Sequence, residues 1–130
     1  MTEPNSAFSP DASVLARLAQ VIAERKANPS GKSYTASLLA GGPPKIGKKI
    51  VEEAHEVVEA SQESGPGARE HVIHEAADVL YHLLVLLGWC DVPLSEVEAE
   101  LGRRFGVSGL DEKASRPPKD GAGNDAPAVG

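Results

Sequence analysis

The stretch Lys45–Leu87 reads KIGKKIVEEAHEVVEASQESGPGAREHVIHEAADVLYHLLVLL, with a Gly65-Pro66-Gly67 triplet in its middle. Glycine accepts left-handed backbone geometry and proline lacks a backbone donor, so the triplet predicts the end of one helix and the start of the next. Two helices joined by so short a break pack antiparallel. The stretch therefore predicts an α-helical hairpin.

Apolar residues recur at helical spacing on both sides of the triplet. Before it they are Ile46, Ile50, Ala54, Val57 and Val58; after it they are Val72, Ile73, Ala76, Leu80, Leu83, Leu84 and Leu87. The end of the second helix is apolar almost all round, because Val79, Val85 and Leu86 point away from this stripe. In so small a protein, we expect a second copy of the chain to cover the other side, so that two hairpins form a four-helix-bundle core.

Flanking helices are expected on both sides of the hairpin. One is predicted over residues 9–28, and a shorter one, capped by Ser33, over residues 33–40. Gly41-Gly42 is expected to close this short helix, and Pro43-Pro44 to open the long helix of the hairpin. Ser95 begins a capping box for a final helix that ends near Phe105. No alternating strand pattern is found, so the fold class is all-α.

Length and composition indicate one domain with polar ends. Of the 130 residues, we expect residues 9–106 to form the domain. Residues 1–8 and the Pro/Gly-rich segment 107–130 contain too little apolar surface to order, and are predicted to be disordered and flexible, respectively.

Charge and cysteine content exclude several classes of function. The chain has 19 acidic and 13 Lys/Arg residues, for a net charge of −6, which argues against a nucleic-acid-binding face. The single cysteine, Cys90, excludes a multi-cysteine metal site and suits a reducing cytosol. The N-terminus lacks the pattern of a signal peptide, and the apolar run Val79–Leu87 is far shorter than the roughly 20 residues that span a bilayer. We expect a cytoplasmic protein with no membrane association.

Four carboxylates are placed symmetrically about the Gly-Pro-Gly break. Glu53 and Asp78 are equally distant from it, and so are Glu56 and Glu75, so each pair should meet at the same height of the hairpin. Within each helix the i, i+3 spacing puts the two acids on one face. Oxygen ligands without cysteine suit a hard cation, Mg²⁺ or alternatively Mn²⁺. Glu52 lies to one side, as an outer ligand or a base that orients water.

Other readings of these residues remain open. Acids at such spacing commonly line a solvated helix face, in which case the protein is a non-catalytic helical dimerisation module. Lys45 and Lys49 precede the acids and either clamp phosphate or form an ion pair such as Lys49 with Glu53. His82 is expected to be packed beside the acids rather than to bind a metal.

The residues EEAHE at 52–56 and EAAD at 75–78 resemble the E-E-x-x-E … E-x-x-D signature of all-α, MazG-type nucleoside triphosphate pyrophosphohydrolases. The stretches KSYT at 32–35 and VLYHLL at 79–84 narrow the resemblance, over roughly residues 12–105, to the phosphoribosyl-ATP pyrophosphohydrolases. These enzymes act in the second step of histidine biosynthesis. They hydrolyse the α–β phosphoanhydride of phosphoribosyl-ATP to phosphoribosyl-AMP and pyrophosphate, and are typically homodimers.

The resemblance implies a role for each matching residue. It implies Mg²⁺ binding by Glu53, Glu56, Glu75 and Asp78, with Glu52, Glu53 and Glu56 as the catalytic carboxylates. It implies substrate contacts for Lys32, Ser33, Tyr34, Thr35, Lys45 and Lys49. The nearest alternative is a house-cleaning dNTP pyrophosphohydrolase with the same metal site, against which the segment 32–35 argues.

Overall fold

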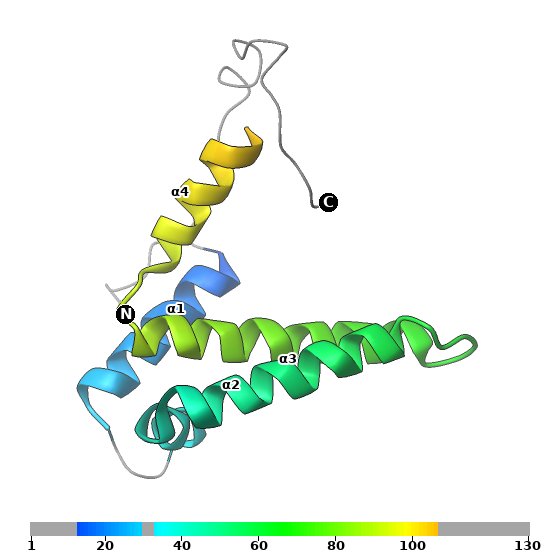
Figure 1. The fold of residues 1–130 in the computed structure, drawn as a ribbon, viewed down its shortest axis with the longest axis horizontal. Helices are drawn as coiled ribbons and strands as arrows, with labels where there is room; N and C mark the ends of the chain where they lie inside the picture. The colour runs from blue at the N-terminus through cyan, green and yellow to red at the C-terminus, as the bar shows by residue number, and fades with distance from the viewer. Residues whose placement is uncertain (1–12, 30–32, 107–130) are drawn as a thin grey trace, which may run out of the picture. The chain divides into compact units, whose positions relative to one another are not determined.

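The computed structural model describes residues 13–29 and 33–106, and in these ranges the chain is helical without any strand (Figure 1). The helices are α1 (Val14–Ala27), α2 (Tyr34–Ala60), α3 (Ala68–Trp89) and α4 (Leu94–Phe105). The predicted all-α class is confirmed. The segments 1–8 and 107–130, for which disorder is predicted, lie outside the described residues.

The chain divides into two compact units, one ending at Leu94 and the other beginning at Ser95. The first unit holds α1, α2 and α3, and with them all the acidic residues singled out from the sequence. The second unit contains the body of α4. A single domain over residues 9–106 stays a prediction.

The predicted hairpin is formed by α2 and α3, which run side by side and are joined at one end (Figure 1). Gly65 and Gly67 adopt positive φ angles of 91° and 85°, as the Gly-Pro-Gly triplet predicts. Gly67 immediately precedes α3, and its carbonyl accepts the backbone N–H of His71 at 3.0 Å. The Gly-Pro-Gly triplet therefore completes the turn between the two helices and leads directly into α3.

A kink at Gly42 divides α2 into a short segment, 34–41, and a long segment, 43–60. Gly42 has φ 72° and ψ −168°, which is not helical, and Pro43 and Pro44 follow it. This matches the predicted stop at Gly41-Gly42 and restart at the two prolines. In a straight helix Tyr34 and Glu53 would be about 28 Å apart, at 1.5 Å per residue. The kink allows both of them to reach α3 at the same place.

Serine side chains cap the first two helices. The Ser33 hydroxyl accepts the backbone N–H of Ala36 at 3.2 Å, which confirms its predicted role at the start of α2. Ser13 caps α1 in the same way, through Ala16 at 3.1 Å. The predicted start of this helix at residue 9 lies outside the described residues.

The predicted capping box of the last helix is wrong. α4 begins at Leu94, so Ser95 is already inside its first turn. The chain has completed its turn earlier, at Asp91 with φ 60°, and Pro93 has a fixed φ that suits the residue before a helix.

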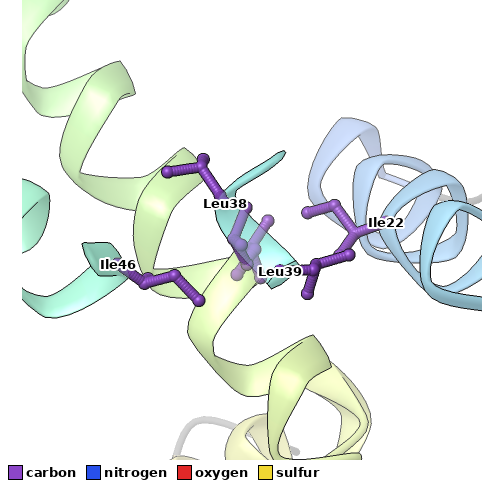
Figure 2. Close-up of a cluster of buried hydrophobic side chains, with 6 residues drawn as sticks. Ile22, Leu38, Leu39 and Ile46 are labelled. Carbon is purple, nitrogen blue, oxygen red and sulfur yellow. The ribbon is translucent and has the colours of Figure 1, made fainter. Parts of the chain in front are cut away.

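The core of the first unit lies where α1 and the short segment of α2 pack on the C-terminal half of α3 (Figure 2). Its members are Ile22, Leu38, Leu39, Ile46, Leu84 and Val85. Val85, which the sequence analysis assigns to the outer side, is 0% exposed, whereas Leu80, expected in the core face, is 45% exposed. The assignment fails because α1 and the first segment of α2 cover a different side of α3 from the one that faces the rest of the hairpin.

An apolar face remains exposed along the hairpin. It is formed by Val51 and Val58 of α2 and by Ile73, Leu80 and Leu83 of α3. At about 100° per residue, the α2 members lie roughly 140–160° around the helix from Glu56, and the α3 members lie equally far from Asp78. The hairpin therefore has an acidic side and, opposite to it, an apolar side.

By length and composition alone, α3 could cross a membrane, with a mean hydropathy of 1.3 over its most apolar window. The core helix of a soluble protein has the same properties. Glu75, Asp78 and His82 lie in the middle and second half of this helix, where a charged group would be costly in a bilayer. Its apolar residues are accounted for by the core and by the exposed apolar side of the hairpin.

Candidate active site

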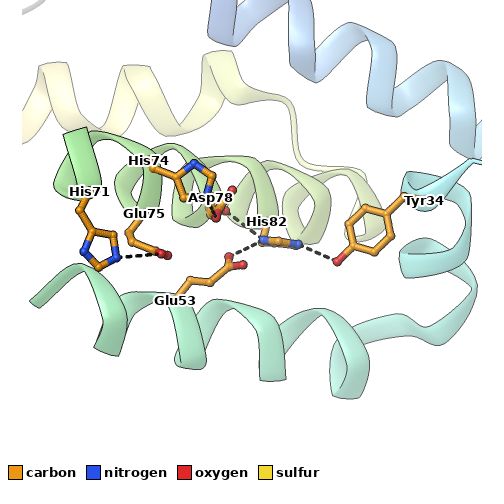
Figure 3. A network of polar contacts seen from close by, with 7 residues as sticks. All are labelled: Tyr34, Glu53, His71, His74, Glu75, Asp78 and His82. Carbon is orange, nitrogen blue, oxygen red and sulfur yellow. Dashed lines mark hydrogen bonds and ion pairs between the residues drawn. The ribbon is translucent and has the colours of Figure 1, made fainter. Parts of the chain in front are cut away.

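Acidic residues of α2 and α3 meet on one side of the hairpin (Figure 3). Glu56 and Glu75 form the pair that the sequence predicts. A hydrogen bond with Glu75, together with the charge of Glu75, raises the pKa of the Glu56 carboxyl above its usual value. Partial burial and the charges of Glu53 and Glu52 raise this pKa further. Two carboxylates close enough to form a hydrogen bond are stable together only if they share a proton or bind a cation.

Glu53 reaches α3 one turn beyond its predicted partner. Its Oε1 atom lies 2.6 Å from Nδ1 of His82. The same nitrogen lies 2.9 Å from the backbone carbonyl of Asp78, so the imidazole joins Glu53 to the turn that begins at Asp78. The sequence predicts that Glu53 meets Asp78, whereas the side chain that contacts Glu53 is His82, one turn further along α3.

Glu75 is the most enclosed of the acidic residues on this side of the hairpin, with 9% of its surface exposed. One carboxylate oxygen, Oε2, lies 3.4 Å from Nε2 of His71. The other, Oε1, is buried and has no donor among the described residues.

His71 forms a bridge at the turn end of the cluster. Its Nδ1 atom lies 3.0 Å from both carboxylate oxygens of Glu63, and this hydrogen bond is the main reason that the pKa of His71 is raised. The charge of Glu63, and then the charge and a hydrogen bond of Glu75, act in the same direction, while partial burial opposes them.

His74 is a neighbour of the acids that is not among the residues predicted for the site. It is exposed, yet its Nε2 atom lies 3.4 Å from Oδ2 of Asp78. One ligand atom from each of His74, Glu75 and Asp78 can be chosen so that all lie within 4.8 Å of one another. The i, i+4 spacing of His74 and Asp78 is the signal that could have revealed this contact.

The first turn of α2 lies beside the acids. The Tyr34 hydroxyl is 3.2 Å from Nε2 of His82, and the Thr35 hydroxyl forms a short hydrogen bond with the Tyr81 hydroxyl. The rings of Tyr34 and Tyr81 are stacked at 6.3 Å between centroids. Two successive residues of α2 are thus joined to two successive residues of α3. Lys32, the first residue of the predicted substrate segment, lies outside the described residues.

The two lysines before the acids have different surroundings. Lys45 donates to the Ser37 hydroxyl at 2.7 Å and so links the long segment of α2 to the short one. Lys49 is half-buried, and the ion pair with Glu53 considered from the sequence is not formed between these two described side chains. Glu52 is exposed, and its charge acts on Glu56.

Residues 15–105 match the sequence model of the family described as phosphoribosyl-ATP pyrophosphohydrolase. The chain belongs to this family.

Curated relatives named phosphoribosyl-ATP pyrophosphatase agree with the family match. The protein of Geotalea daltonii is 56% identical over 103 residues, which cover 79% of this chain and 94% of the relative. That of Dinoroseobacter shibae is 57% identical over 104 residues, covering 80% of this chain and 99% of the relative. That of Rhodopirellula baltica is 49% identical over 109 residues, covering 84% and 91%.

The region matched by the family, residues 15–105, contains the whole hairpin, all of α4 and nearly all of α1. All the residues proposed from the sequence as ligands, catalytic groups or substrate contacts fall inside it. The resemblance recognised over residues 12–105 is therefore confirmed at the level of the family.

Proposed function

We propose that the protein hydrolyses the α–β phosphoanhydride of phosphoribosyl-ATP, giving phosphoribosyl-AMP and pyrophosphate, in histidine biosynthesis. The observation that carries the proposal is the meeting of Glu56 and Glu75 across the hairpin, within an acidic cluster, in a chain of this family. The names of the relatives, which share about half of their residues with this chain over nearly their full length, support the choice of substrate.

We further propose that Glu53, Glu56, Glu75 and Asp78 hold Mg²⁺, for which Mn²⁺ can substitute. The buried Oε1 atom of Glu75 has no donor within residues 13–29 and 33–106, and the pKa of Glu56 is raised by its neighbour, so both carboxylates would gain from a cation between them. An all-oxygen set of carboxylates fits a hard divalent ion. When bound, such an ion neutralises charge on the phosphates of the substrate and on the leaving pyrophosphate.

The remaining residues of the cluster act on water and substrate. Water must attack a phosphorus of the anhydride and lose a proton while the phosphorus–oxygen bond to the leaving group breaks. Glu52 is exposed beside Glu53, and we assign to it the orientation of this water. Glu53 and Glu56 keep the reacting phosphates next to it.

The first turn of α2 and the lysines after its kink are proposed to bind the nucleotide. Ser33, Tyr34 and Thr35 form the N-terminus of a helix, where free N–H groups and the helix dipole favour phosphate. Lys32, Lys45 and Lys49 would supply positive charge in an otherwise acidic protein. Lys45 would exchange its contact with Ser37 for a phosphate oxygen.

We propose that the protein is a cytoplasmic homodimer. The apolar side of the hairpin, which includes Val51, Val58 and Leu80, is exposed in one chain. A second hairpin placed on it would complete a four-helix bundle and remove these side chains from water. A bilayer would be a poorer environment, because the same helix carries Glu75 and Asp78.

The decisive experiment measures pyrophosphate release from phosphoribosyl-ATP beside a panel of dNTPs, with and without Mg²⁺. We expect Mg²⁺-dependent turnover of phosphoribosyl-ATP and loss of turnover in Glu56→Gln with the fold intact. Glu59→Gln is the matched control, because Glu59 is on the same helix and, within the part of the chain that the structure describes, its ion pair is with the exposed His55. Near-full activity of Glu56→Gln at saturating Mg²⁺ would disprove the assignment. Preference for a dNTP, or absence of any turnover, would disprove the proposed substrate.

A further inference from the structure

Both ring nitrogens of His82 contact side chains of α2. Nδ1 lies 2.6 Å from Glu53, the proposed metal ligand, and Nε2 lies 3.2 Å from the hydroxyl of Tyr34, in the proposed nucleotide-binding turn. The three side chains lie in a row in Figure 3. One imidazole therefore stands between the two functions of the site.

The roles of the two nitrogens are fixed by their partners. Nδ1 faces only acceptors, the Glu53 carboxylate and the Asp78 carbonyl at 2.9 Å, so it carries the hydrogen. Nε2 then meets the Tyr34 hydroxyl, which can donate to it. His82 is 4% exposed, so its ring cannot turn away without opening the hairpin.

A second contact keeps the turn of α2 in place. Thr35, which is buried, bonds through its hydroxyl to that of Tyr81, next to His82 in α3. A displacement of the first turn of α2 would therefore strain or break the hydrogen bonds to Tyr81 and His82. The kink at Gly42 is what returns this turn to α3, since a straight helix would keep Tyr34 about 28 Å from Glu53.

We propose that His82 is a positioning residue through which Tyr34 and Glu53 are coupled, so that nucleotide bound at the first turn of α2 strengthens metal binding at the acidic cluster. The inference rests on the proposed function for the identity of both ligands. A metal held by Glu53 would restrict the motion of its carboxylate, and the hydrogen bonds of His82 would pass this restriction on to the Tyr34 hydroxyl. Because coupling is reciprocal, metal strengthens nucleotide binding by the same factor.

The experiment measures Mg²⁺ affinity by titration calorimetry, with and without phosphoribosyl-AMP, the proposed product, which cannot be hydrolysed at the same bond. Coupling of this kind is typically roughly 5- to 150-fold, and we expect an increase in this range for the unaltered protein. Tyr34→Phe removes only the hydroxyl. It should bind Mg²⁺ alone as the unaltered protein does, and lose most of the increase caused by the nucleotide.

Two substitutions of His82 separate its two contacts. His82→Asn places an amide N–H where Nδ1 was, so it should keep Mg²⁺ affinity in the absence of nucleotide but lose the coupling. His82→Gln places a polar atom near the position of Nε2 and loses the donor to Glu53, so Mg²⁺ affinity alone should fall by about 10- to 100-fold. His55→Gln, on the exposed side of α2, is the control and should change neither quantity.

Each outcome bears on the inference. Full coupling in Tyr34→Phe, or an equal loss of Mg²⁺ affinity in His82→Asn and His82→Gln, would overturn it, since the second result means that His82 only fills space. Mg²⁺ binding and turnover in the unaltered protein without coupling would refute this inference and leave the proposed function standing. Absence of Mg²⁺ binding would refute both.

Discussion

Replacement of Gly42 by alanine tests whether one residue holds the kink of α2. At φ 72° and ψ −168°, Gly42 occupies a backbone region that is essentially restricted to glycine. Forcing another residue into such a region costs about 1–3 kcal/mol. A β-carbon built there would lie 3.5 Å from Nε1 of Trp89, an ordinary contact distance. Backbone strain, and not a collision, is therefore the expected cause of destabilisation.

Gly47→Ala is the matched control in the same helix. A β-carbon at Gly47 would meet nothing within 4 Å, and the position lies in the regular long segment of α2. Alanine in a helix interior is more favourable than glycine by about 0.5–1 kcal/mol. Both substitutions restrict the unfolded chain equally, so this effect cancels, and the remaining difference of about 1–3 kcal/mol isolates the conformation at residue 42.

The assay is urea unfolding of both variants at one fixed protein concentration, because self-association would make stability depend on concentration. A loss of 1 kcal/mol corresponds to roughly 4–8 °C in Tm for a unit of this size, so thermal unfolding provides a second measurement. Equal stability of Gly42→Ala and Gly47→Ala would show that Gly42 does not fix the kink. Unchanged Mg²⁺ affinity in a destabilised Gly42→Ala protein would show that the kink is not needed to place Tyr34 and Glu53.

Two further predictions concern the two sides of the hairpin. Leu80→Glu puts a charge on the exposed apolar side and should convert the proposed dimer into a monomer in sedimentation experiments. Glu70→Gln, a surface change in the same helix, is the control and should leave the dimer intact. A dimer that survives Leu80→Glu excludes this face as the interface. On the acidic side, the pKa of Glu56 is raised in the folded protein, mainly by Glu75, so this group favours folding less as pH rises above the usual carboxyl value of 4.5. Without metal, Glu56→Gln should therefore raise Tm at pH 7 and raise it progressively less below pH 4.5. Added Mg²⁺ should stabilise the unaltered protein more than the variant. A lower Tm for the metal-free variant at pH 7 would contradict the proposed repulsion between Glu56 and Glu75.

The hairpin and the meeting of Glu56 with Glu75 could be predicted because both depend on local rules. The Gly-Pro-Gly triplet fixes where the helices end, and a constant rise per residue then places Glu56 opposite Glu75. The kink at Gly42 followed from the two prolines after it. None of these steps needs knowledge of which faces of the helices pack together.

What could not be predicted depends on tertiary packing. Val85 and Leu80 are equally apolar and both belong to a helix that is apolar almost all round, so periodicity does not distinguish the buried residue from the exposed one. The choice is made by α1 and the short segment of α2, whose docking on α3 no local pattern encodes. The contact of His74 with Asp78 is of a different kind, because it lies within one helix and its i, i+4 spacing can be read from the sequence.

The position of His82 follows from the kink and the packing acting together. Its place on the acidic stripe of α3 could be deduced from the sequence, but not that Tyr34 would approach it, because Tyr34 precedes Glu53 by five turns of what would otherwise be a straight helix. Once Gly42 turns the first segment back, one helix supplies both the proposed nucleotide-binding turn and a proposed metal ligand, and a single buried imidazole contacts both. A helix that contributes twice to one site makes each contribution depend on the other. For this reason, a substitution at residue 42, which touches neither ligand, is expected to alter the binding of both.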